Sequence, residues 1–469
     1  MKNRKLWGGR FDRRPAAKTE AFSSSLSVDS RLAQYDVEGS IAHCRMLAHA
    51  GIIEKPESEK IIKSLSEIRA ALEDDRFLFE PSDEDIHTAV ERALYEKIGV
   101  LAGKLHTGRS RNDQIVLDER LYVRGLLADL DQGLRGLQKS LLVWVQKNPK
   151  AILPAFTHLQ HSQAILFGHW GLAYLEMFQR DRDRLADAGR RVNVLPLGAS
   201  AGAGSSLPLD PDYTAKLLGF SGIFANSLDA VSDRDFLLEV LADLSIVAVH
   251  LSRLCEELVL WSSSEFNFIE IDQRYCTGSS ALPQKKNPDI PELVRGKAGV
   301  VFGGLVALLT TMKSLPLSYN RDLQEDKPPF FNAADAVLSS LEVLAEMIPH
   351  TRVNAAVMRR AAETGHVTAL DLSEFLVRRG MPFREAHGVV GGVVRQCLAQ
   401  NKPLAGLSLA ELKKHSRLFT REAKNLLSAT ESVKHRLSPG SSNPDQVAVK
   451  IKEWAGVLFL EKNPYGASR

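Results

Sequence analysis

The sequence predicts a mostly α-helical protein built around a bundle of long helices. Between Ile223 and Thr277 the chain has neither glycine nor proline. Leucine and valine recur there every three or four residues, which is the period of a helix and not the alternation of a strand. Four other long segments share this pattern, and no regular succession of strands and helices separates them. A helical bundle is therefore favoured over a parallel-sheet fold.

The helices are expected in the following order. Lys18 to Phe79 should form shorter helices, among them Ser30–Ala50 and Ser58–Glu73. Five long helices should follow, at residues 114–146, 164–194, 233–261, 291–313 and 333–347. The third of these is apolar around much of its circumference, so we expect it to be buried among other helices.

Glycine and proline suggest where the domains begin and end. Breaks recur after His350, so the helices there should be short again. We place boundaries near residues 108 and 360. These give an N-terminal helical domain (1–108), a central long-helix domain (109–360) and a small C-terminal helical domain (361–469).

Composition excludes several classes of protein. The 469 residues include 60 Lys and Arg against 57 Asp and Glu, so there is no cationic excess for binding nucleic acid or a membrane surface. The four cysteines lie far apart in sequence, which argues against a disulfide scaffold or a cysteine zinc site. The most apolar charge-free run, Ala298–Met312, is shorter than the roughly 18 residues that a membrane span needs. The basic N-terminus is not followed by an apolar stretch, and we expect a cytoplasmic protein.

The first of three polar segments, Thr107–Gln114, directly precedes a long predicted helix. Backbone N–H groups at a helix start, together with Ser110, Arg111 and Asn112, would form a receptor for a carboxylate. An elaborate helix cap explains the same residues equally well.

The second and third polar segments are richer in chemistry. Residues 156–163 place His158 and His161 among hydroxyl and amide side chains just before a predicted helix. Residues 275–289 form a turn-rich loop with glycine and two prolines. An exposed basic loop is one interpretation, but a lid that closes over an anion fits better. The residues that favour the lid are Ser279, Ser280, Lys285, Lys286 and Asn287.

Three short motifs are discounted. Gly103–Ser110 resembles a phosphate-binding loop but lacks a preceding strand. Gly198–Gly202 matches the G-x-S-x-G motif around Ser200, but the strand and helix setting of a serine hydrolase is missing. His158 and His161 have a spacing seen in metal sites, without an acidic neighbour. We expect no metal and no cofactor.

Loop 275–289 closely resembles the GSSxMPxKxN signature of the fumarase/aspartase superfamily. Further segments narrow the resemblance to the argininosuccinate lyase family, and they run in that family's order. They are residues 6–11, 84–88, 108–114, 157–160, 232–236 and 319–327, with 376–387 in the last quarter of the chain.

The resemblance implies a three-domain, mostly helical subunit. The long helices of four subunits would pack into a twenty-helix core, with each active site shared between subunits. It implies reversible cleavage of argininosuccinate to arginine and fumarate, a step of arginine biosynthesis, without a cofactor. The partners would be a small-molecule substrate and other copies of this chain, with no nucleic acid and no membrane. Another fumarate-releasing lyase, or a catalytically silent crystallin-like homologue, is the alternative.

The resemblance also implies roles for individual residues. Ser279 matches the base, His158 the acid, Glu292 the carboxylate partner of that histidine, and Lys285 a holder of the intermediate's carboxylate. His87 would lie behind the substrate contacts. The matched substrate contacts are Ser25, Asp85, Ser110, Arg111, Asn112, Thr157, Arg234, Asn287, Tyr319, Gln324 and Lys327.

The chain departs from the family's pattern near these segments. Leu282 replaces a methionine of similar volume, which should be mild. His161 replaces an arginine and removes a permanent charge. Val90 and Ala93 replace an asparagine and an arginine.

Overall fold

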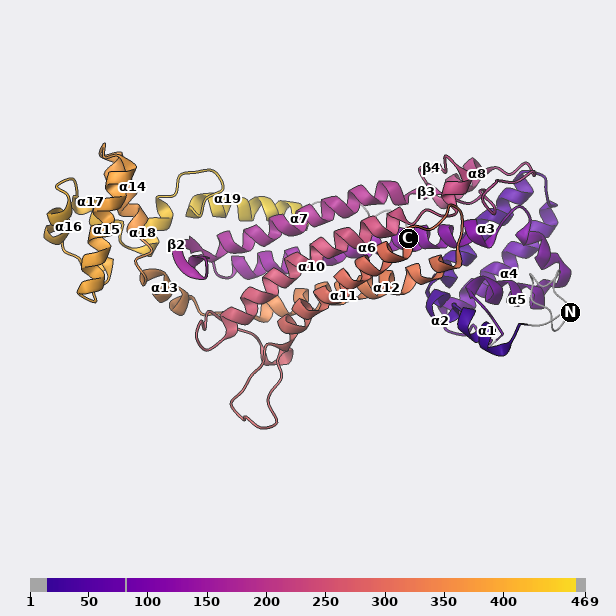
Figure 1. Ribbon diagram of the computed structural model, residues 1–469, viewed down its shortest axis with the longest axis horizontal. Coiled ribbons are helices and arrows are strands. Elements are labelled where there is room, and N and C mark those ends of the chain that lie inside the picture. Colours follow the sequence, from indigo (N-terminus) through magenta and orange to yellow (C-terminus); the bar gives the residue numbers. More distant parts are fainter. Residues whose placement is uncertain (1–14, 81, 461–469) are drawn as a thin grey trace. The chain divides into compact units, whose positions relative to one another are not determined.

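The computed structural model describes residues 15–80 and 82–460 of the chain (Figure 1). The predicted motif at residues 6–11 lies outside the described residues. The chain divides into two compact units, each made of three stretches. Unit 1 comprises residues 1–129, 184–245 and 300–335, and unit 2 comprises residues 130–183, 246–299 and 336–469. The predicted domain boundaries near 108 and 360 remain predictions.

The mostly helical fold class is confirmed, and five long helices run from one unit into the other. They are α6 (Arg111–Gln146), α7 (Phe167–Val192), α10 (Asp235–Ser262), α11 (Asp289–Met312) and α12 (Lys327–Met347). Helix α12 begins six residues before its predicted start. Its first turn contains Pro328 and Pro329, and proline is tolerated there because the first N–H groups of a helix have no partner within it.

The N-terminal part of unit 1 is a group of short helices around its own core. They are α1 (Ala17–Ser23), α2 (Leu26–Asp29), α3 (Ala33–His49), α4 (Lys55–Glu73) and α5 (Ile86–Ile98), followed by the 3₁₀ helix η3 (Gly99–His106). Helix α4 begins with a capping box formed by Glu54 and Glu57. Leu47, Ile61 and Leu94 are fully buried between these helices.

Apart from its segments of the long helices, the rest of unit 1 is largely irregular. Strands β3 (Val194–Leu195) and β4 (Gly222–Ile223) pair in parallel, and the other elements are α8 (Pro211–Leu218), α9 (Ser227–Ala230) and η5 (Arg321–Asp326). The predicted glycine-rich loop that starts at Pro196 runs without regular structure up to α8.

Unit 2 combines long-helix segments with a helical C-terminal region. Trp144, Phe167, Trp170 and Trp261 pack against one another in its core. Strands β5 (Ile269–Glu270) and β6 (Arg352–Val353) form an antiparallel pair. The C-terminal helices are α13 (Ala355–Glu363), α14 (Ala369–Arg378), α15 (Phe383–Ala399), α16 (Leu409–His415), α17 (Arg421–Asn425), α18 (Ala429–Lys434) and α19 (Pro444–Ala455).

Residues 152–166 form a β-hairpin, whereas the sequence predicted a polar segment followed directly by a helix. Strands β1 (Ile152–Thr157) and β2 (Gln160–Leu166) pair antiparallel, and α7 starts after them, at Phe167 and not at 164. His158 and Leu159 form the two-residue turn, with left-handed φ angles of 55° and 58°. Such turns normally carry Asn-Gly or Asp-Gly, so the sequence lacks the usual hairpin signal.

Helix α11 exposes an unusual amount of apolar surface. By length and composition alone it would be able to cross a membrane, and 28% of its apolar window is buried. The exposed side chains include Phe302, Val306 and Leu309 in unit 1, and Leu293 in unit 2. A helix that packs into the core of an assembly can have the same length and apolar composition.

Candidate active site

The start of α6 joins the first predicted segment to the glycine-rich loop. Ser110 caps the helix, because its Oγ accepts the N–H of Asn112 at 3.2 Å. The carboxylate of Asp113 accepts backbone N–H groups from Ser110 (2.9 Å), Gly198 (3.1 Å) and Ser200 (2.7 Å). Burial raises the pKa of Asp113 to about 6, although these donors act to lower it. Ser110 and Asp113 thus both act as caps at the start of α6, as the helix-cap interpretation allowed, and Asp113 also anchors the glycine-rich loop.

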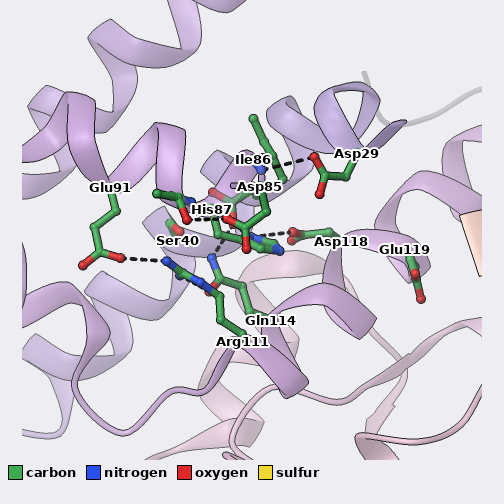
Figure 2. A network of polar contacts seen from close by, with 12 residues as sticks. Asp29, Ser40, Asp85, Ile86, His87, Glu91, Arg111, Gln114, Asp118 and Glu119 are labelled. Carbon is green, nitrogen blue, oxygen red and sulfur yellow. Dashed lines mark hydrogen bonds and ion pairs between the residues drawn. The ribbon is translucent and has the colours of Figure 1, made fainter. Parts of the chain in front are cut away.

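Behind this helix start lies a buried polar network (Figure 2). His87 Nδ1 lies 2.9 Å from Asp36 Oδ1 and 3.6 Å from Asp118 Oδ2. Gln114 also donates to Asp36, and Arg109 donates to Ser40 at 2.8 Å. These contacts place His87 behind the surface residues of unit 1, as the sequence suggested.

The pKa values of the two carboxylates in this network are shifted in opposite directions. Burial alone would raise the pKa of Asp36, but His87 and Arg109 outweigh it and lower that pKa to about 2. Burial and the neighbouring Asp36 raise the pKa of Asp118 well above its usual value. The ligand atoms of Asp36, His87 and Asp118 lie within 4.8 Å of one another, close enough to hold a metal ion. Arg109 already supplies a cation to the same carboxylates.

Ser25 and Asp85 are held at the edge of this network. Ser25 donates to Asp29, which also accepts the N–H of Ile86 at 3.2 Å. Asp85 caps α5 by accepting the N–H of Thr88 at 2.6 Å. Burial acts to raise the pKa of Asp85, but His87 and Arg111 lower it, so the carboxylate is ionised.

The predicted segment 319–327 is tied to the same edge. Arg321 donates to Ser23 O at 2.7 Å and pairs with Glu84 at 3.0 Å, and Gln324 donates to Ser23 O at 3.3 Å. Burial raises the pKa of Tyr319, whose electrostatic neighbours include Lys327. Nine of the predicted substrate contacts thus lie in unit 1, namely Ser25, Asp85, Ser110, Arg111, Asn112, Arg234, Tyr319, Gln324 and Lys327.

Arg234 and Lys327 are the most deeply buried of the predicted substrate contacts. Arg234 is fully buried and pairs with Glu119 and Asp326. Lys327 is 4% exposed and pairs with the same two carboxylates.

The predicted acid–base residues lie in unit 2 and are mostly exposed. Thr157 and His158 are at the hairpin turn. The predicted lid projects as an open loop ahead of α11 (Figure 1) and carries the exposed Lys285. Glu292 is exposed on the first turn of α11.

The root of the lid is fixed by a small set of hydrogen bonds. Thr277 and Asn287 pair through their backbones, at 2.8 and 3.3 Å. Asp289 accepts both the N–H of Thr277, at 2.8 Å, and its hydroxyl, at 2.7 Å. Further out, the Oγ of Ser279 accepts N–H groups from Ala281 (3.2 Å) and Leu282 (3.1 Å).

The acid–base residues are not joined within one chain. Among residues 15–80 and 82–460, no hydrogen bond or ion pair connects His158, Ser279 and Glu292. Ser200 likewise makes no hydrogen bond to a histidine in this part of the chain, which agrees with the dismissal of a serine hydrolase.

Sequence reasoning missed the buried acids that support these residues. They are Asp29, Asp36, Asp113, Asp118, Glu119 and Asp326. The available signal was the presence of three acids, at positions 113, 118 and 119, in the first turns of a long helix.

Comparison with known proteins places this arrangement in a family. A family model described as "Lyase" matches residues 9–303, and one described as "Argininosuccinate lyase C-terminal" matches residues 366–434. Argininosuccinate lyase from Syntrophus aciditrophicus is 49% identical over 99% of this chain and 97% of its own. Its counterpart from Thioalkalivibrio sulfidiphilus is 50% identical over 98% of both chains.

Solved structures agree with this assignment. An EDDS lyase in complex with formate superposes with a TM-score of 0.83 and 29% identity, covering 92% of this chain and 87% of that one. A 3-carboxy-cis,cis-muconate lactonizing enzyme from Pseudomonas putida shares the fold, with a TM-score of 0.73 and 20% identity, covering 93% of this chain and 98% of that one. The chain therefore belongs to the argininosuccinate lyase family of the fumarase/aspartase superfamily.

Proposed function

We propose that this protein cleaves argininosuccinate reversibly to arginine and fumarate, as a step of arginine biosynthesis. The observation that carries the proposal is the identity of about half the residues with argininosuccinate lyases over almost the whole chain. The candidate acid–base residues His158, Ser279, Lys285 and Glu292 are all present in the segments that carry the resemblance.

The reaction removes a proton from the carbon beside a carboxylate and then breaks the bond from the neighbouring carbon to a guanidinium nitrogen. We assign Ser279 as the base that takes the proton. A serine is too weak a base unless its alkoxide is stabilised. The N–H groups of Ala281 and Leu282 already point to Ser279 Oγ, which supports the assignment.

The intermediate carries two negative charges on one carboxylate, and donors fixed at that position stabilise it. Lys285 and Asn287 supply these donors in our proposal. His158 protonates the departing nitrogen as the carbon–nitrogen bond breaks and the double bond of fumarate forms. Glu292 holds the tautomer of His158. General acid–base catalysis of this kind contributes about 10²–10⁴-fold to the rate.

The remaining predicted contacts bind the rest of the substrate. Ser110, Arg111, Asn112 and Thr157 would receive its carboxylates. Ser25, Asp85, Tyr319, Gln324 and Lys327 would receive the amino-acid end and the bridging region. Unit 1 supplies all of these except Thr157.

We further propose that the protein works in the cytoplasm as a homotetramer whose active sites are shared between subunits. Two observations support the assembly. No hydrogen bond or ion pair connects His158, Ser279 and Glu292 in the described part of the chain, and α11 exposes Val306 by 61% and Phe302 by 41%. Free cysteines at all four positions suit a reducing compartment.

The test of the reaction is fumarate release from argininosuccinate, followed by ultraviolet absorbance with purified protein and no added cofactor. Adenylosuccinate serves as the control substrate. Fumarate from argininosuccinate alone supports the proposal, and a correctly assembled protein that releases none would refute it.

The test of the assembly is Val306→Asp, because a buried unpaired charge opposes association. We expect smaller particles in sedimentation analysis and loss of activity. Leu437→Asp is the matched control, since Leu437 is 80% exposed in the C-terminal region. Full activity in a dissociated Val306→Asp protein would contradict shared active sites.

A further inference from the structure

Four buried ionisable side chains in unit 1 form a closed ring. The acids are Glu119 on α6 and Asp326 at the end of η5, and the cations are Arg234 and Lys327. Burial and Asp326 raise the pKa of Glu119 to about 7, although Arg234 and Lys327 act to lower it. Asp326 reaches Lys327 Nζ with Oδ1 at 2.7 Å and Arg234 Nε with Oδ2 at 2.5 Å. Glu119 reaches Lys327 Nζ with Oε1 at 3.3 Å and Arg234 Nε with Oε2 at 3.1 Å. Each acid therefore bridges the same two cations.

The ring is separate from the His87 network. Asp118 and Glu119 are adjacent on α6, but Figure 2 shows Asp118 pointing to His87 and Glu119 pointing away from it. None of the four ring residues is more than 4% exposed. One helix thus supplies an acid to each of two buried networks.

Burying this ring costs desolvation free energy that an apolar core would not cost. Removing two ion pairs from water costs several kcal/mol per ion, and well-packed apolar residues often serve stability as well or better. Burial by itself lowers the pKa of Lys327, yet Asp326 and Glu119 outweigh it and raise that pKa. The arrangement therefore keeps a deeply placed lysine charged and fixed.

The geometry also limits which further groups Lys327 and Arg234 can contact. A lysine has three N–H donors, and two of them face Asp326 and Glu119. Arg234 has no exposed surface, and its guanidinium contacts Asp326, Glu119 and the backbone oxygen of Asp233.

We propose that Glu119, Asp326 and Arg234 are positioning residues that hold the Lys327 ammonium so that its remaining donor faces an anionic group of the substrate. Arg234 acts through the two carboxylates and does not touch the substrate. This modifies the role that the family resemblance suggested for Arg234, and it rests on the proposed function.

The test is a double-mutant cycle on argininosuccinate cleavage. Glu119→Gln preserves shape and removes a charge, so we expect KM to rise about tenfold while kcat changes about twofold or less, the effect of one charge-assisted hydrogen bond. Lys327→Met should raise KM further. In the Lys327→Met background, Glu119→Gln should change KM no further, because Glu119 acts through Lys327.

Additive effects of the two substitutions on KM would overturn the proposal, and so would a loss confined to kcat or to thermal stability. Asp131→Asn is the matched control, because Asp131 is a buried acid paired with Arg182 at 2.6 Å in unit 2. It should lower the melting temperature and leave KM unchanged. A KM change as large as that of Glu119→Gln would also overturn the proposal.

A substitute variant and a prior measurement keep the test able to contradict the proposal. If Glu119→Gln does not fold, Glu119→Gln with Arg234→Met removes one anion and one cation together, and the same cycle is run with that pair. Wild-type activity is measured first, so that absence of fumarate release is recognised as failure of the proposed function and not of the ring.

Discussion

In unit 1, buried ionic networks lie next to the predicted site residues and include Arg234 and Lys327, whereas unit 2 carries its site residues on a hairpin turn, an open loop and the first turn of α11. Asp36, Glu119 and Lys327 are each less than 5% exposed, and their partners come from several helices. Ser279 and Lys285 contact little beyond their own loop. A buried side chain is held in one position, but it loses its hydration. An exposed side chain keeps its hydration and becomes ordered when a ligand binds.

We interpret this difference as a division between residues of unit 1 that bind the substrate and residues of unit 2 that catalyse the reaction. Fixed donors and acceptors in unit 1 suit recognition of the ends of a substrate that do not change in the reaction. The loop in unit 2 suits groups that must exclude water only while the bond is broken. If this division is correct, substitutions in unit 1 should act on affinity or stability, and substitutions on the loop should act on rate.

The largest effect should come from Ser279→Ala. Loss of the proposed base should reduce kcat by about 10²–10⁴-fold. The affinity for argininosuccinate, measured by calorimetry on the slow variant, should stay within about threefold, less than one hydrogen bond contributes. Ser280→Ala, next to it on the same loop, is the control and should keep most of the activity. A Ser279→Ala protein that turns over normally would remove Ser279 from the mechanism.

Asp113→Asn should weaken the stability of unit 1. The amide cannot accept all three N–H groups as the carboxylate does, and an unsatisfied buried group costs about 1–3 kcal/mol. Denaturant unfolding should show this loss. Asp212, an exposed acid on α8, offers the control Asp212→Asn. Equal stability of the two variants would mean that Asp113 does not anchor the glycine-rich loop.

The stability of unit 1 should also fall in mild acid. Burial lowers the pKa of His43 to about 3, so this imidazole stays neutral in the folded chain. An unfolded histidine has a pKa near 6.5. Below that pH the unfolded chain binds an additional proton, and the free energy of unfolding should fall by up to about 1.4 kcal/mol per pH unit for this group.

The matching variant for this pH dependence is His43→Gln, whose amide still donates to the backbone oxygen of Thr107. It should reduce the slope of stability against pH between about pH 6 and 4. His387→Gln, on an exposed surface of α15, should leave the slope unchanged. An unchanged slope in His43→Gln would show that another group governs the acid sensitivity.

The smallest effect is expected for Leu282→Met, which restores the residue usual in the family's signature. Leu282 is 47% exposed and the two side chains have similar volumes. Steady-state kinetics should change by no more than about twofold, well under the effect of one hydrogen bond. A larger gain would show that this side chain packs tightly in the closed state of the loop.

The sequence predicted the long helices well, because apolar periodicity over twenty or more residues is difficult to mistake. It missed the hairpin, since His158 and Leu159 adopt a turn that normally requires asparagine and glycine. It also placed the start of α12 six residues too late, and the missed first turn contains Pro328 and Pro329.

The three polar segments of the candidate site stood out from the residues themselves, whereas the roles of individual residues followed from the resemblance. Periodicity does not say which of two adjacent acids on a helix points inward, or toward which partner. Asp118 and Glu119 illustrate this, because each is buried in a different network. Only tertiary packing, which joins residues up to 208 positions apart in the ring, reveals the partners of these two acids.

The hairpin turn has a consequence for attempts to make this protein more heat-resistant. Leu159 has a φ of 58° and is 71% exposed, so the chain keeps a branched apolar residue where glycine would be more stable by about 1 kcal/mol. Leu159→Gly is therefore the kind of substitution that a stability screen would select. It would also loosen the turn that aims the imidazole of His158, and the screen would then favour robust but slow enzymes.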